Sequence, residues 1–245
     1  MNKITKKGKV LLLAYDQGLE HGPTDFNDKN VNPEYIIDIA EKGYTGIIFQ
    51  KGVAEKYQNK LKQAKVSLIL KLNGKTNLVK GEPISRQICS VDEAVKLGAV
   101  AVGYTIYIGS EHESKMLDEF AHIEEQAHKK GLPVIAWIYP RGKSVKGKPS
   151  KQLMAYACRV GLEIGADIVK IRYNGKLEDL KWAVKSAGKT KVVIAGGMKK
   201  QESKLLEDVK ETMQAGASGL AIGRNIWQSK EPDKITRELK RLVFK

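Results

Sequence analysis

Short apolar runs alternate with amphipathic stretches along the whole chain of 245 residues. The apolar runs predict eight strands, over residues 10–16, 45–50, 66–72, 99–107, 132–140, 166–173, 191–197 and 219–226. Helical spacing of apolar positions predicts helices over residues 33–42, 91–97, 113–130, 151–164, 177–187, 201–215 and 233–244. The strands are nearly continuous in Val, Ile and Leu, which is typical of parallel sheets covered by helices on their outer face.

Eight strand–helix units predict an α/β fold, a single-domain (β/α)8 TIM barrel over residues 1–245. Three helix-to-strand joints carry glycine, at Gly98, Gly165 and Gly216, where a left-handed residue would end the helix. No linker rich in Pro, Gly or Ser divides the chain. An open dinucleotide-binding sheet is the alternative, but the segment after the first strand, residues 16–22, lacks the G-x-G-x-x-G spacing.

Lys170 is the strongest candidate for chemistry, because it lies inside an apolar strand between Val169 and Ile171. Alternation places Ile168, Lys170 and Arg172 inward in a barrel. Burial disfavours the charged ammonium and lowers the pKa of a lysine, and the free amine that results can attack a carbonyl to form a Schiff base. Lys71, near the end of the third strand, is the rival amine. We assign it a supporting role, either at a substrate phosphate or in lowering the pKa of Lys170; a lysine reaching to solvent is the alternative.

Three further side chains lie at strand ends, where TIM barrels carry their active sites. Asp16 shares a face with Leu12 and Ala14, and Trp137 shares a face with Tyr139. Asp16 could instead cap a helix or turn, and the two aromatic residues could fill the core. The coincidence of Asp, Tyr and Lys at strand ends favours an active site.

Two glycine-containing segments predict an anion site. Gly196 and Gly197 follow the seventh strand, and Gly223 and Arg224 follow the run Leu-Ala-Ile of the eighth. Glycine lets backbone N–H groups approach an anion, a short helix amino terminus and Arg224 add positive potential, and phosphate sites of this fold lie in these loops. Residues 73–76 (Asn-Gly-Lys-Thr) are a further candidate wall.

The net charge of +15 is spread along the chain rather than clustered, so it predicts a lysine-coated surface and attraction of an anionic substrate. Nucleic-acid binding is disfavoured for the same reason. No apolar run is long enough to cross a bilayer, and the basic first nine residues lack a signal-peptide core, so we expect no membrane association and a cytoplasmic location. The four histidines and two cysteines show no metal-ligand spacing, so no metal and no cofactor are expected.

Taken in order, the strand-end motifs resemble those of the archaeal-type class I fructose-1,6-bisphosphate aldolases. The resemblance is carried by AYDQGLEHGP (14–23), FQKG (49–52), LKLNGKT (70–76), VGYTIYIGS (102–110), WIYPRG (137–142), VKIRY (169–173) and IGRNIWQ (222–228). One departure from the family is Ala195, where we expect a serine in several relatives.

This resemblance implies a lyase that cleaves fructose 1,6-bisphosphate reversibly, with Lys170 as the Schiff-base lysine and Asp16 and Tyr139 in proton transfer. Trp137 would line the sugar site, and the phosphate contacts would fall on Gly196, Gly197, Gly223 and Arg224. Lys71 and Arg141 are further candidates for substrate binding. A ring-based homo-oligomer is also implied, with a decamer as one form. The alternatives are a related Schiff-base lyase or synthase, such as an aminodideoxyheptulosonate synthase, and a barrel that binds phosphorylated ligands without catalysis.

Overall fold

The computed structural model describes residues 1–245, and its main feature is a closed barrel of eight parallel strands. Around the barrel the strands follow in the order β1, β2, β3, β6, β7, β8, β9 and β10, and β10 pairs with β1 to close it. Their bounds are Val10–Ala14, Gly46–Gln50, Leu68–Lys71, Ala101–Ile106, Val134–Ile138, Ile168–Arg172, Lys191–Ala195 and Gly219–Ile222. The predicted (β/α)8 fold is therefore confirmed.

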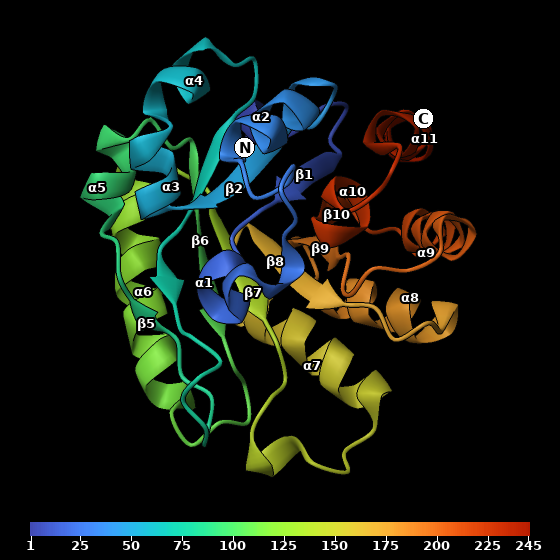
Figure 1. Cartoon of the computed structure of the whole chain (residues 1–245). Coiled ribbons are helices and arrows are strands. Elements are labelled where there is room, and N and C mark those ends of the chain that lie inside the picture. The colour runs from blue at the N-terminus through green and yellow to red at the C-terminus, as the bar shows by residue number, and fades with distance from the viewer.

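Helices surround the strands on the outside of the barrel (Figure 1). The main helices are α2 (Pro33–Glu41), α5 (Val91–Lys96), α6 (Glu113–Lys129), α7 (Ser150–Glu163), α8 (Leu177–Ser186), α9 (Glu202–Gln214) and α11 (Pro232–Val243). Shorter ones are α1 (Gly18–His21), α3 (Lys51–Lys56), α4 (Gln58–Gln63), α10 (Arg224–Trp227) and the 3-10 turns η1 (Asn2–Ile4), η2 (Gly22–Asp25) and η3 (Lys143–Val145). No helix is both long enough and apolar enough to cross a membrane.

Alternation along each strand divides the apolar side chains between two cores. Leu12, Ile69 and Ile168 belong to a small cluster inside the barrel. Their neighbours, such as Val169 and Ile171, belong to the larger layer between strands and helices. Ile4 of η1 also joins the interior cluster and is fully buried, so the amino-terminal turn closes the bottom of the barrel.

The structure confirms the predicted glycine helix stops, but the predicted strand bounds differ from the observed ones. Gly98, Gly165 and Gly216 have φ of 85°, 80° and 86°, so the left-handed helix stops are confirmed. All eight predicted strands are longer than the observed strands, by one to four residues each, counted over both ends. Residue Ile226, predicted in the last strand, lies in α10.

Several short elements were not predicted, among them two helices and a hairpin. Helices α3 and α4 carry few buried residues, only Ala54 and Leu61, so their apolar pattern is weak. The small antiparallel hairpin of β4 (Asn73–Gly74) and β5 (Arg86–Gln87) is too short for a pattern to show.

Candidate active site

The inward faces of the strands change from apolar to polar at their carboxyl ends. Ile48 is followed two residues later by Gln50, Ile69 by Lys71, and Ile168 by Lys170. These polar side chains border a cavity that is lined by 24 residues and opens to solvent. All ten predicted site residues line it: Asp16, Lys71, Trp137, Tyr139, Arg141, Lys170, Gly196, Gly197, Gly223 and Arg224.

Lys170 lies on the floor of this cavity and is 5% exposed. Burial lowers its pKa to about 8, and the positive charges of Lys71 and Arg172 act in the same direction, while Asp16 partly opposes them. At pH 7 a pKa of about 8 leaves about 9% of the side chain as free amine. A lysine with the ordinary pKa of 10.5 would hold far less of the free amine at this pH, so the site enriches the nucleophile.

The indole of Trp137 lies beside both buried amines. Its ring centre is 5.0 Å from Nζ of Lys170 and 5.4 Å from Nζ of Lys71. The ring lies over Gly103 of β6, where an added Cβ would stand 1.6 Å from Cζ3 of the indole. Glycine at 103 is therefore needed for this ring position, and Trp137 Nε1 is buried without a hydrogen-bond partner inside the protein.

Asp16 lies just past the end of β1 and accepts a hydrogen bond from Nζ of Lys71 at 3.2 Å. Burial alone would raise the pKa of Asp16, but the charges of Lys71 and Lys170 outweigh burial and hold the pKa below its usual value. Asp16 is therefore a carboxylate at neutral pH, influenced by the charges of Lys71 and Lys170.

Tyr139 lies between two guanidinium groups. The carbon Cζ is 5.7 Å from the ring centre for Arg141 and 5.3 Å for Arg172. Burial and the negative charge of Asp16 raise the pKa of Tyr139 despite these cations. The side chain is therefore a protonated phenol at neutral pH, a form that can donate a proton.

The two glycine loops meet on one side of the cavity. Gly196 approaches Ile222 so closely that an added Cβ would stand 2.6 Å from its Cγ1, and at Gly223 it would stand 2.3 Å from the carbonyl oxygen of Ala14. Gly197 has φ of 69°, which favours glycine. Glycine is therefore required at positions 196 and 223 by the close packing of the strand ends, in addition to any role in letting backbone N–H groups approach an anion.

Arg224 extends from this side of the cavity toward the loop after β1. Its Nη1 lies 3.4 Å from both carboxylate oxygens of Asp25, and Asp25 also contacts Nδ1 of His21 at 2.6 Å. Its ion-pair partner Asp25 lies in η2.

Several residues that line the cavity were missed or placed differently. Gln50 could have been found by the alternation that found Lys71, and Tyr107 by its place after β6. Glu20 lies on the short helix α1, where its ion pair with Arg141 at 3.2 Å could not be seen in the sequence. Asn73, a candidate for the basic wall, is fully buried and bonds to the backbone of Ser85 and Thr105.

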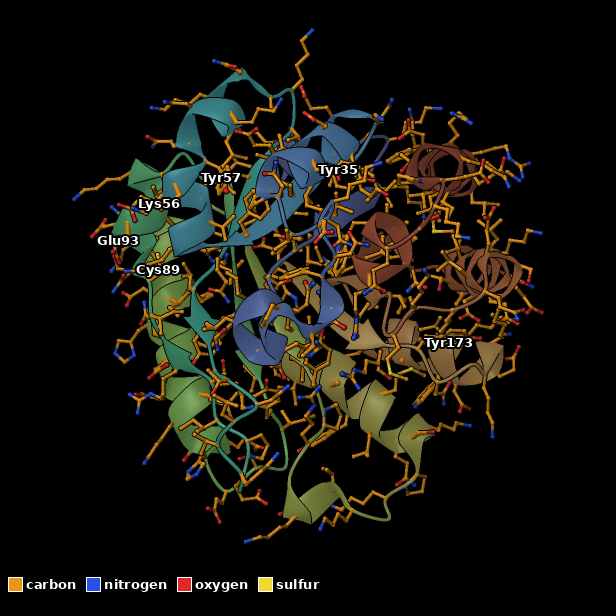
Figure 2. All side chains as sticks on the ribbon, viewed as in Figure 1. Tyr35, Lys56, Tyr57, Cys89, Glu93 and Tyr173 are labelled. Carbon is orange, nitrogen blue, oxygen red and sulfur yellow. The ribbon has the colours of Figure 1, made fainter.

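Outside this cavity the titratable groups suggest no second centre. Nowhere do three or more His, Cys, Asp or Glu side chains gather closely enough to hold a metal ion. Cys89 and Cys158 are both buried and unpaired, and burial raises the pKa of each thiol. Nitrogen-tipped side chains project from the outer helices all around the outline in Figure 2, in keeping with the spread positive charge.

Comparison with known proteins places this geometry among aldolases. Residues 10–229 match the model of the DeoC/LacD family aldolases. A class 1 fructose-bisphosphate aldolase of Thermoproteus tenax is 49% identical over 243 residues, which cover 98% of this chain and 91% of that protein. A class 1 fructose-bisphosphate aldolase of Halobacterium salinarum is 44% identical over 244 residues, covering 98% and 92%.

A solved structure gives the same result in three dimensions. It is an archaeal fructose-1,6-bisphosphate aldolase whose catalytic lysine is bound covalently to the carbinolamine intermediate of the substrate. It is 47% identical to this chain, has a TM-score of 0.94, and the match covers 100% of this chain and 97% of that one.

Proposed function

Because this chain belongs to the DeoC/LacD family of aldolases, we infer that its cavity performs a Schiff-base aldol reaction. The substrate we propose is fructose 1,6-bisphosphate, cleaved reversibly to dihydroxyacetone phosphate and glyceraldehyde 3-phosphate. The relatives that match at 49% and 44% identity over 98% of the chain carry this activity in their names. The observation that carries the proposal is Lys170, a buried lysine in the cavity with a pKa lowered to about 8.

The first step is the attack of the Lys170 amine on the C2 ketone. A carbinolamine forms and loses water to give an iminium, which accepts the electron pair released when the C3–C4 bond breaks. The lowered pKa matters here because only the free amine is a nucleophile. The iminium of Lys170 is cationic while its nitrogen is protonated, and the carboxylate of Asp16 is a candidate counter-charge for it.

Proton transfer is assigned to Asp16 and Tyr139 by their ionisation states. Asp16, a carboxylate, accepts or relays the proton of the C4 hydroxyl as glyceraldehyde 3-phosphate leaves. Tyr139, a phenol, protonates the enamine at C3, and hydrolysis then frees dihydroxyacetone phosphate. The same groups run the condensation in reverse.

Substrate binding is assigned to residues that line the cavity. Gly196, Gly197, Gly223 and Arg224 surround one phosphate. Arg141 is a further binding group of the cavity, and its Cζ lies 5.1 Å from the ring centre of Tyr107. Trp137 forms the wall beside the reacting carbon, and Lys71 supports Asp16 and depresses the pKa of Lys170.

Steady-state cleavage of fructose 1,6-bisphosphate in the presence of EDTA tests the proposal. We expect turnover in the wild type, because the iminium serves as electron sink, and none in Lys170→Met, because a thioether cannot condense with a ketone. Turnover that disappears in EDTA and returns with zinc would favour a metal-dependent mechanism. Absence of turnover would favour the related synthases or a non-catalytic phosphate binder. One catalytic domain over 1–245, a cytoplasmic location and a homo-oligomer remain part of the proposal.

A further inference from the structure

Asn225 is a buried side chain that joins the two glycine loops. It is 3% exposed and follows Arg224 directly. Its Nδ2 donates to the carbonyl oxygens of Gly196 at 2.9 Å and Met198 at 3.0 Å, and its Oδ1 accepts from the backbone N–H of Lys200 at 2.8 Å. Asn225 does not line the cavity, so it cannot contact a ligand there.

Each of these bonds acts on the backbone of the loop after β9. Two carbonyl oxygens of residues 196–200 are turned toward Asn225 and away from the cavity, while Gly196 and Gly197 line the cavity. The N–H of Gly197 donates to no other group of the protein. Since an anion is repelled by carbonyl oxygens and attracted by N–H groups, the orientation of these peptides decides whether the loop accepts a phosphate.

The same side chain also holds the loops at a fixed separation. Its own backbone lies next to Gly223 and Arg224, whereas its amide is bonded to the loop of Gly196 and Met198. We propose that Asn225 is a positioning residue for a phosphate group of the substrate, through the loops that carry Gly197 and Arg224. This inference rests on the proposed function, because it assumes a phosphorylated substrate in this cavity.

The alternative is that Asn225 contributes only to stability, as any fully bonded buried amide does. The chain offers a matched control in Asn73, which is 0% exposed. Its Nδ2 donates to the carbonyl oxygens of Ser85 and Thr105, at 2.9 and 2.8 Å, and its Oδ1 accepts from the N–H of Thr105 at 2.8 Å. Both amides therefore make two donor bonds and one acceptor bond to backbone, but Asn73 holds β4 against β6, away from the glycine loops.

The experiment compares two donors that form the same Schiff base, dihydroxyacetone phosphate and unphosphorylated dihydroxyacetone. Borohydride trapping gives the half-saturating concentration of each donor for wild type, Asn225→Ala and Asn73→Ala. In Asn225→Ala we expect this concentration to rise about tenfold or more for the phosphorylated donor, the effect of one or two lost hydrogen bonds. For dihydroxyacetone the half-saturating concentration should change by less than about twofold in Asn225→Ala. In Asn73→Ala the half-saturating concentrations of the two donors should change by the same factor.

An equal loss for both donors in Asn225→Ala, or an unchanged affinity for the phosphorylated one, would overturn the inference. If Asn225→Ala does not fold, Asn225→Asp keeps the volume and the acceptor for Lys200 N–H, and the same separation of donors is expected. A wild type that traps neither donor would refute the proposed function itself. If the wild type traps both donors but the Asn225 variants weaken both equally, only the role of Asn225 is refuted.

Discussion

Replacement of Lys71 by methionine is expected to slow Schiff-base formation at neutral pH while leaving the nucleophile in place. Both Nζ atoms lie near the Trp137 ring, at 5.4 Å for Lys71 and 5.0 Å for Lys170, so the two charges are at most about 10 Å apart. At this separation and an effective dielectric constant of about 20, two unit charges repel by about 1.7 kcal/mol. This energy corresponds to about 1.2 pKa units on Lys170.

The sign of the effect follows from what Lys71→Met removes. The positive charge of Lys71 lowers the pKa of Lys170, so its loss raises that pKa. Asp16 also loses its partner at 3.2 Å, and its negative charge then acts more fully on Lys170, in the same direction. At pH 7 the fraction of free amine should therefore fall about tenfold or more, and the rate should recover as the pH rises through the higher pKa.

The assay is the rate of reductive trapping of dihydroxyacetone phosphate between about pH 6 and about pH 10. Wild type should show a rise with a midpoint near pH 8, the pKa of Lys170. Lys71→Met should shift this midpoint upward. Lys75→Met is the matched control, because Lys75 lines the same cavity but is only partly buried, and its Nζ donates to Oδ1 of Asn77. A midpoint that stays or falls in Lys71→Met, or an equal shift in Lys75→Met, would refute the reasoning.

Three further substitutions test other parts of the cavity. Tyr139→Phe should keep Schiff-base trapping but slow turnover by about 10²–10⁴-fold, because only the proton donor is removed; normal turnover would make Tyr139 a wall residue. Arg224→Ala should weaken phosphorylated substrates on the scale of charge-assisted hydrogen bonds, about 1.5–3 kcal/mol each, with partial recovery in Arg224→Lys. An equal loss with unphosphorylated donors, together with a lower Tm, would indicate that the pair with Asp25 is its main role. Gly103→Ala should lower the free energy of unfolding by about 1–3 kcal/mol, because the added Cβ would collide with the Trp137 ring. Gly52→Ala is the control, because a Cβ at that position meets no other atom, and equal unfolding curves for the two variants would contradict the prediction.

The barrel and the central residues of the cavity could be predicted because both follow from period-two alternation. Ile168, Lys170 and Arg172 fall on one face of a strand whichever helices cover the other face. The rule that active sites lie at the carboxyl ends of barrel strands then brings Asp16, Tyr139 and Lys170 together without any knowledge of distances.

What could not be predicted depends on contacts between loops far apart in the sequence. The pair of Glu20 with Arg141 spans 121 residues, and the pair of Arg224 with Asp25 spans 199. The bonds of Asn225 to Gly196 and Met198 likewise join separate loops. No periodicity indicates such contacts, because they arise only when the closed barrel brings its loops to one end.

Borohydride reduction in the presence of dihydroxyacetone phosphate, followed by peptide mass mapping, tests the central claim most directly. We expect a single reduced adduct on Lys170, the buried amine with a pKa of about 8, and its loss in Lys170→Met. An adduct that maps to Lys71, or that persists in Lys170→Met, would contradict the assignment of the nucleophile.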